Sequence, residues 1–407
     1  MSLAMALAPI RELGVELERD WAASDYDRSA FPDLCAERLE AARLHTAVDP
    51  DQIVDEVFRG ELPQQFDPSA RFGQPPVTLF RAAQFFIDAL FWVDGTTTIH
   101  DHSFSGAFQV LAGQSIETTF RFTPSHDFDG RVQLGQLSAG GSELRSTGDV
   151  CAVPAGPVYI HSLFHLARPS VTLVVRTYRD PNPGKQFTYS PAGVAFDFLS
   201  EDQNRDRVVQ AVEMLRKTEH PAFESRVGDL IGRSNVNTGF SIIRACAKAC
   251  DNATLERLTA RVSDPEAGRR IRDWAVQRRR IEFLISRRNL IHDPSLRFLL
   301  AVLLNARRRS DALALTSRFT SDDDPARRIA AMLRALGGIT MRLRLGSEPF
   351  EPNVLGLPPF GPGCEEGLAD LLAGRERPPN PAVDAFIDRL RALPALEPLF
   401  SGDDRDR

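Results

Sequence analysis

The feature that most constrains the fold of this chain is a change in sequence texture near residue 76. Between residues 76 and 190 the chain consists of short runs rich in Val, Ile, Thr, Phe and Tyr, interrupted by Gly, Pro, Asn and Asp. Runs of this length with frequent turn signals are typical of an antiparallel sheet, in a sandwich or a barrel. The stretch RDPNPGKQFTYSPAG at 179–193 is rich in turn formers, and we expect it to be a linker that leaves this region.

Helical patterns flank the β-rich region on both sides. Residues 5–45 carry apolar side chains at steps of three and four, and amphipathic pieces such as DRVVQAVEMLRK return from about residue 200 onward. We therefore expect an α+β protein in three parts. These are an N-terminal helical region at 1–74, an antiparallel β region, either a sandwich or a barrel, at 75–192 and a C-terminal all-α domain at 193–407.

Charge and composition exclude several classes of protein. Acidic residues exceed basic ones, 55 against 49, and this balance disfavours nucleic acid as a partner because proteins that bind it are usually basic. No run approaches the roughly 18 apolar residues of a membrane-spanning helix, so we expect no membrane partner. The five cysteines are scattered and odd in number, and no signal peptide is recognisable. We therefore expect reduced thiols and a cytoplasmic protein.

Two histidine-bearing segments within the β-rich region carry the chemistry. His100 and His102 are two residues apart, which on a strand places both imidazoles on one face and Asp101 on the other. His161 follows a Pro/Gly turn about sixty residues later, a separation that leaves room for intervening hairpins to bring the strands together. Three imidazoles that converge in this way are candidate metal ligands.

These segments resemble the two signature motifs of the cupin superfamily, small double-stranded β-helix barrels that hold a metal ion in the barrel mouth. The matching positions are Gly95, His100, His102 and Gly113 in the first motif, and Gly148, Pro154, Gly156 and His161 in the second. The resemblance implies that the β-rich region at 75–192 is an antiparallel cupin barrel. The glutamate ligand that many cupins carry after the second histidine is missing, because residues 103–107 read SFSGA.

Within the cupins, the chain is most similar to the cysteine dioxygenase (thiol dioxygenase) group. The run TIHDHSFSGAFQVLAGQSIETTF at 98–120 and the later Cys151-Ala152 and His161 carry this likeness, which spans about residues 75–180. It implies Fe(II) held by three histidines without a carboxylate, with another divalent metal such as Zn, Ni or Mn as the alternative. Some members have a cysteine crosslinked to a tyrosine, but that cysteine corresponds to Ala107 here, so we expect no such crosslink.

Further candidates surround the three ligands. Tyr159 shares a strand face with His161 and is a candidate catalytic phenol. His165 lies on the same face if the strand continues, and it is either a residue that tunes the metal or a histidine at a strand end. The active-site tyrosine of the family corresponds to Arg176 or to Tyr178, depending on the placement of a short gap.

The anchor for a substrate carboxylate has two candidates. Arg176 is one, because an arginine that points into a barrel is costly unless it meets an anion. A strand register shifted by one residue would instead turn Arg176 to solvent. Arg81, upstream of the first motif, is the other candidate.

The resemblance implies a mononuclear non-haem iron oxygenase that uses O2 on a small thiol or amino-acid-derived substrate. One alternative is a metal-dependent cupin enzyme that performs another reaction, such as hydroxylation, ring or C–C cleavage or isomerisation, on a larger substrate. Another is a non-enzymatic binding or regulatory protein that works through the helical domain. That domain is also where we would place a homodimer contact or a protein partner.

We interpret two other features as structural and not as functional sites. The arginine runs at 269–270, 278–280 and 307–309 form local positive patches, which we interpret as solvated helix faces. Cys246 and Cys250 are four residues apart on an expected helix, but no second pair or nearby histidine completes a metal site. We interpret them as core cysteines.

Overall fold

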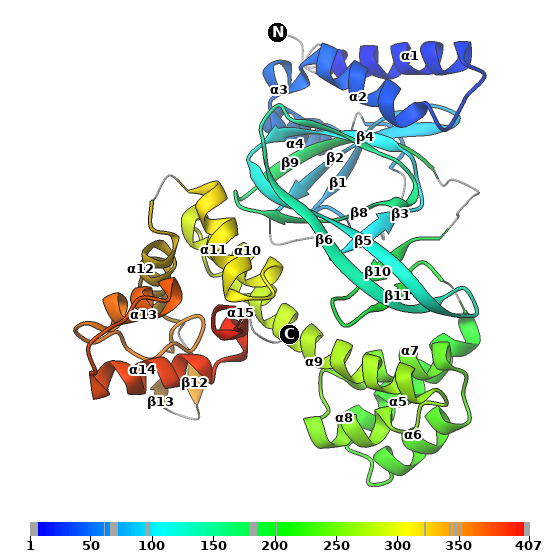
Figure 1. The fold of residues 1–407 in the computed structure, drawn as a ribbon. Coiled ribbons are helices and arrows are strands. Elements are labelled where there is room, and N and C mark those ends of the chain that lie inside the picture. Colours follow the sequence, from blue (N-terminus) through cyan, green and yellow to red (C-terminus); the bar gives the residue numbers. More distant parts are fainter. Residues whose placement is uncertain are drawn as a thin grey trace. The chain divides into compact units, whose positions relative to one another are not determined.

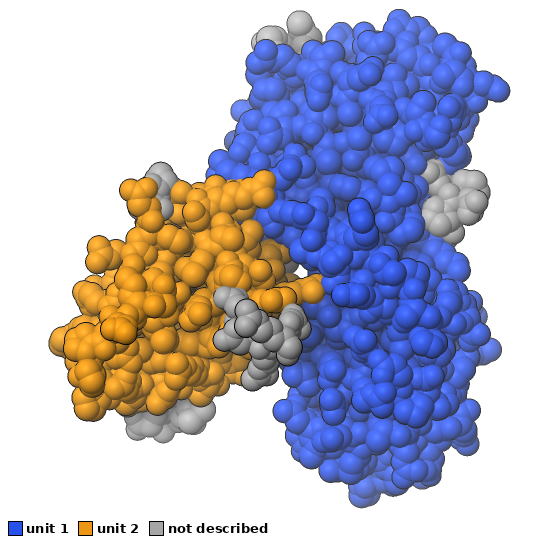
Figure 2. Space-filling model, viewed as in Figure 1, with its two compact units in different colours: residues 1–279 blue, residues 280–407 orange. Residues whose placement is uncertain are grey.

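The computed structural model describes residues 7–60, 62–65, 72–93, 98–178, 185–200, 202–320, 323–341, 343–345, 348–350 and 352–402. The chain forms two compact units, residues 1–279 and 280–407 (Figure 2). The first unit contains the N-terminal helices, the strands of the β-rich region and a further group of helices (Figure 1).

Among the described residues, four helices precede the strands: α1 (Ala8–Ala23), α2 (Phe31–Ala42), α3 (Leu44–Ala47) and α4 (Pro50–Arg59). The buried side chains of α1 recur at steps of three and four, as the sequence pattern predicted. Trp21 of α1 stacks on Phe31 of α2 with ring centroids 3.9 Å apart, and both rings pack near Phe85 of the sheet. The N-terminal helices thus share one apolar core with one face of the barrel.

The β-rich region forms the strands β1 (Pro76–Arg81), β2 (Phe85–Trp92), β3 (His100–His102), β4 (Gly106–Ala112), β5 (Gln114–Phe128), β6 (Val132–Ser146), β7 (Val150–Val153), β8 (Gly156–His165), β9 (Ser170–Thr177), β10 (Phe187–Tyr189) and β11 (Val194–Asp197). One sheet has the order β1-β2-β9-β4-β7. The other closes on itself in the order β10-β11-β6-β5-β8-β3, and its neighbouring strands pair antiparallel. At Gly106, β4 approaches β9 so closely that a Cβ atom would collide with the carbonyl oxygen of Val175.

The segment that we expected to be an exit linker is instead part of the barrel, so this prediction is wrong for its described residues. β10 lies inside 179–193 and β11 follows directly, and the two strands pair with each other and close the second sheet. Residues 179–184 lie outside the described residues. Strands of three and four residues are too short for the period-two pattern to show, and the neighbouring Pro and Gly dominate the local composition.

A second group of helices follows the barrel: α5 (Gln203–Lys217), α6 (Phe223–Gly232), α7 (Val236–Cys246), α8 (Asn252–Thr259) and α9 (Pro265–Arg288). Apolar side chains of these helices share a core with β6 and β11. Phe240 of α7 lies between Phe196 and Trp274, at centroid distances of 5.0 and 4.9 Å. The barrel therefore packs against helices that precede it in the chain and against helices that follow it.

The second unit is helical, as predicted for the C-terminal region, apart from one short hairpin. Its elements are α10 (Pro294–Asn305), α11 (Arg309–Phe319), α12 (Pro325–Gly337), the hairpin strands β12 (Leu343–Leu345) and β13 (Glu348–Phe350), α13 (Cys364–Ala373), α14 (Pro381–Arg391), the 3-10 turn η2 (Pro394–Leu396) and α15 (Glu397–Phe400). Asp293, Asp324 and Asn380 cap the N-termini of α10, α12 and α14 with their side chains. Across the described parts of the chain, no helix has the length and apolar character needed to span a membrane.

Several arginines of the runs bond to backbone carbonyls and do not lie free on a helix face. Arg279 donates to the carbonyl oxygen of Ala247 at 2.6 Å within the first unit. Arg280 donates to the carbonyl oxygens of Leu303 at 2.6 Å and of Pro394 at 3.0 Å within the second. The interpretation of these runs as solvated faces is therefore wrong for these two residues, which satisfy carbonyl groups near helix ends.

Candidate metal centre

Three buried histidines converge in the barrel. β3 carries His100 and His102, and β8 carries His161, which is paired with His100 in the antiparallel register. The ring centroids lie 4.7 to 5.0 Å apart, and one nitrogen from each ring falls within 4.8 Å of the others. The structure thus brings together the three residues that sequence spacing singled out. Among the described residues, this group of potential ligands contains no carboxylate or thiol.

The surroundings of these rings suit a metal ion. Nδ1 of His161 lies 2.6 Å from Glu117, and Nδ1 of His100 lies 2.8 Å from the carbonyl oxygen of Thr98, which leaves the opposite nitrogen of each ring as the ligand. Nδ1 of His102 is buried with no hydrogen-bond partner among the described residues. Burial, followed by the neighbouring histidines, lowers the pKa of His100 to about 3 and that of His102 well below its usual value. Both rings are therefore neutral near pH 7, as ligands must be.

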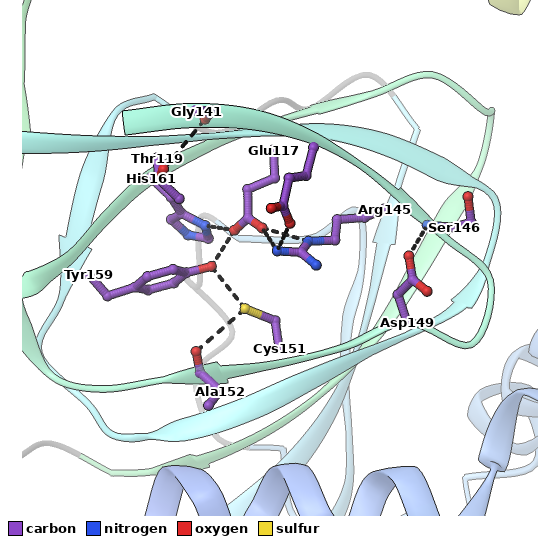
Figure 3. A network of polar contacts seen from close by, with 11 residues as sticks. Glu117, Thr119, Gly141, Arg145, Ser146, Asp149, Cys151, Ala152, Tyr159 and His161 are labelled. Atoms are coloured by element: carbon purple, nitrogen blue, oxygen red, sulfur yellow. Dashed lines mark hydrogen bonds and ion pairs between the residues drawn. The ribbon is translucent and has the colours of Figure 1, made fainter. Parts of the chain in front are cut away.

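Glu117 is the main residue of the site that sequence reasoning missed. It lies buried on β5, and Figure 3 shows that its carboxylate meets His161, Tyr159 and Arg145. Arg145 donates through Nε at 2.6 Å, and the hydroxyl of Tyr159 donates a very short hydrogen bond. Burial raises the pKa of Glu117, but the hydrogen bonds from His161 and Tyr159 and the charge of Arg145 outweigh it and lower the pKa to about 2. An ionised carboxylate thus supports one ligand from behind.

Tyr159 packs against the histidines and does not line the small cavity that adjoins them. Its ring centroid lies 4.5 Å from that of His161 and 5.8 Å from that of His102, and its oxygen lies 3.1 Å from Sγ of Cys151. Burial, followed by the charge of Glu117, raises the pKa of Tyr159, so its phenol stays protonated. The contacts of Tyr159 place it in the support of the ligands.

A small cavity of about 60 Å³ adjoins the three histidines. Most of its wall is apolar, formed by Phe72, Leu90, Trp92, Phe104, Phe108, Val153, Leu163 and Val174. The other polar side chains of the wall are Thr172, Arg176 and Gln186. Thr172, Val174 and Arg176 alternate along β9, so the strand register turns Arg176 inward.

Arg176 is held in the wall by one ion pair and two aromatic rings. It donates to Asp88 at 2.8 Å, and Asp88 also accepts a hydrogen bond from Thr78 at 2.8 Å. Its guanidinium carbon lies 4.7 Å from the ring centroid of Phe86 and 5.4 Å from that of Phe104. Nε of Arg176 is buried, and none of the described residues accepts a hydrogen bond from it. The pair with Asp88 thus leaves a donor for a ligand.

The remaining candidates do not line this cavity. Arg81 is exposed and contacts Tyr178, whose hydroxyl donates to the carbonyl oxygen of Ala82 at 3.0 Å. Tyr178 follows the last residue of β9, so it lies beyond the part of that strand that forms the wall. His165 is fully buried and stacks on Trp92 at 4.6 Å. It lies four residues along β8 from His161, about 13 Å in an extended strand.

Comparison with known proteins adds to this picture. No family model matches the chain, and no curated protein matches it. Among solved structures, a cupin-2 domain protein from Shewanella frigidimarina aligns with 30% of this chain and 89% of its own, at 11% identity and a TM-score of 0.19.

Two enzymes are also among the similar structures. Hydroquinone 1,2-dioxygenase PnpCD, in complex with Cd2+ and 4-hydroxybenzonitrile, aligns over 28% of this chain and 68% of its own at 19% identity and a TM-score of 0.20. Recombinant oxalate oxidase in complex with glycolate aligns over 29% and 57% at 16% identity and a TM-score of 0.19. Likeness at this level concerns the fold alone.

Proposed function

We propose that this protein is a metal-dependent cupin oxygenase that holds Fe(II) through His100, His102 and His161 and oxidises a small thiol with O2. The observation that carries the proposal is the cluster of three buried imidazoles without a carboxylate, next to a small cavity. Imidazole ligands suit Fe(II), Zn and Ni, whereas Mg, Ca and Mn prefer oxygen ligands. When bound, Fe(II) supplies a redox-active Lewis acid at which a thiolate and O2 can react.

The overall reaction would convert a thiol and O2 into a sulfinic acid. Both oxygen atoms are added to sulfur and the thiol proton is retained in the product acid, so RSH and O2 balance RSO2H without a further reductant. The chain's own residues bind and orient the substrate. The apolar wall excludes water, and the unpartnered Nε of Arg176 donates to an anionic group such as a carboxylate.

The support of the ligands is also part of this proposal. Glu117 fixes the tautomer and orientation of His161, and the charge of Arg145 keeps Glu117 ionised. Tyr159 acts through Glu117 and by packing on the imidazoles, so it is a positioning residue.

The size of the cavity favours a small substrate over a large one. Pockets for drug-sized ligands usually enclose about 300 to 1,000 Å³, whereas this cavity encloses about 60 Å³. A thiol of a few heavy atoms fits this space better than a large substrate does.

The test begins with the metal content of protein purified under conditions that retain its native ion. The protein is then reconstituted with Fe(II) without oxygen, and oxygen uptake is followed with cysteine, 3-mercaptopropionate and cysteamine. We expect about one equivalent of metal, uptake with at least one of these thiols, and a product heavier by two oxygen atoms in mass spectrometry. Stable iron binding without uptake by any thiol would remove the thiol assignment and leave the metal site.

A further inference from the structure

The metal-binding strand β3 is only three residues long, so few backbone contacts hold it. β3 pairs with β8 at two positions, with an irregularity between them, and with β10 at one position. One further backbone hydrogen bond joins Tyr189 to the carbonyl oxygen of Ile99 at 2.8 Å. Two of the three candidate ligands therefore stand on a short strand that backbone pairing alone holds weakly.

A buried side chain behind the ligands supplies additional contacts. Asp101 lies between His100 and His102 and is 2% exposed. Its carboxylate accepts the backbone N–H of Phe187 at 2.6 Å and the hydroxyl of Tyr189 at 2.8 Å. Both donors belong to β10, so one side chain bonds the metal-binding strand to the strand that closes the barrel.

This contact has a direct consequence for the imidazoles. Successive side chains of a strand point to opposite faces, so fixing Asp101 on one face fixes the backbone that aims His100 and His102 from the other. A carboxylate is expensive to bury, and accepting two strong hydrogen bonds offsets that cost only if both donors stay in place. The same contact holds Phe187, the residue next to the cavity-lining Gln186.

We propose that Asp101 is a positioning residue of the metal centre, which holds the His100–His102 strand in the geometry that binds the ion. The inference rests on the proposed function in one respect only, that the three histidines bind a metal. It requires neither a thiol substrate nor an oxidation.

The experiment compares Asp101→Leu, Asp101→Asn and Tyr189→Phe with the wild type, using Co(II) alone as the probe. Competition with a chelator gives the affinity, the visible absorption of the saturated protein reports the geometry around Co(II), and thermal unfolding of the metal-free protein reports stability. Glu56→Leu is the matched control, because Glu56 is a buried carboxylate on α4 that is absent from the cavity wall.

We expect Asp101→Leu to weaken Co(II) binding about 100-fold and Tyr189→Phe about tenfold, the range typical for partners of metal ligands. Asp101→Asn keeps an acceptor for Phe187 and should recover most of the affinity, while the absorption bands of the Leu variant should shift. Glu56→Leu should leave Co(II) affinity unchanged.

Other results separate this inference from the proposed function. If the wild type binds Co(II) and the Asp101 and Tyr189 variants bind it equally well, Asp101 supports only the fold and the inference falls. If the variants lose affinity but no thiol is oxidised, the inference stands and the proposed reaction falls. A wild type that binds no metal overturns both. Should Asp101→Leu not fold, Tyr189→Phe, which keeps the carboxylate, still decides the question.

Discussion

The β-barrel and the C-terminal unit both bury charged side chains, but they use them differently. In the barrel, Arg176 lines a cavity that adjoins the three histidines, and Glu117 contacts His161. In the C-terminal unit, Arg288 and Arg297 are also fully buried, and Arg297 donates to the carbonyl oxygen of Ile291 at 2.6 Å. A buried charge therefore indicates a functional site only where it lines a cavity or contacts a residue that does.

The largest expected effect would test this contrast within a single strand. His161→Ala removes one of the candidate ligands, and we expect metal affinity to fall by about 1,000-fold or more, because two imidazoles of one strand rarely suffice for a stable site. The matched control is His165→Ala on the same face of β8, where the histidine stacks on Trp92. Metal analysis and chelator competition check both. Equal losses in the two variants would show that we have misplaced the boundary of the site.

Arg297→Met should produce the next largest effect, in the other unit and on another property. The change leaves the buried carbonyl of Ile291 without this donor, which should lower the free energy of unfolding by about 2 to 4 kcal/mol. Chemical denaturation measures the loss. Metal affinity should not change, since Arg297 is absent from the cavity wall. Loss of metal affinity without loss of stability would contradict the view that the buried charges of the C-terminal unit support its fold and not the metal site.

Glu117→Gln would sharpen the comparison inside the barrel. The amide cannot supply the negative charge that faces His161 and Arg145, so we expect metal affinity to fall by about 10- to 100-fold. Glu143→Gln is the matched control, because the exposed Glu143 contacts the same Arg145 at 2.8 Å but no histidine. Affinity measured by competition should be unchanged in this control. A comparable loss there would assign the effect to Arg145.

These residues also show what the sequence can and cannot predict. Spacing predicted the three histidines, because alternation along a strand is a local property and the two motifs carry their own turns. Glu117 escaped notice because its role depends on a partner 44 residues away, which only the pairing of β5 with β8 reveals. The flanking helices followed from periodicity and the antiparallel strands from short apolar runs between turn residues, whereas the choice of a barrel came from the family resemblance. The three-residue strand β10 was too short for any period to show.

Arg176→Met tests whether the buried guanidinium in the cavity wall binds the carboxylate of the substrate. With the proposed activity, KM for 3-mercaptopropionate should rise about tenfold, the worth of one hydrogen bond to a charged group. KM for cysteamine, which has no carboxylate, should stay the same. Steady-state oxygen uptake with both thiols gives the answer. An equal rise for both would mean that Arg176 shapes the cavity and does not recognise an anion.

The smallest effect is expected at Arg81, the other candidate anchor. Arg81 is exposed and contacts Gln64 and Tyr178 at 3.3 to 3.4 Å, and surface contacts of this kind contribute little. Arg81→Met should therefore change KM for 3-mercaptopropionate less than about twofold and leave the free energy of unfolding within about 0.5 kcal/mol of the wild type. The same uptake assay and a denaturation curve measure both. A rise in KM as large as that of Arg176→Met would place the carboxylate outside the cavity, because the two guanidinium groups lie in different surroundings and only Arg176 lines its wall.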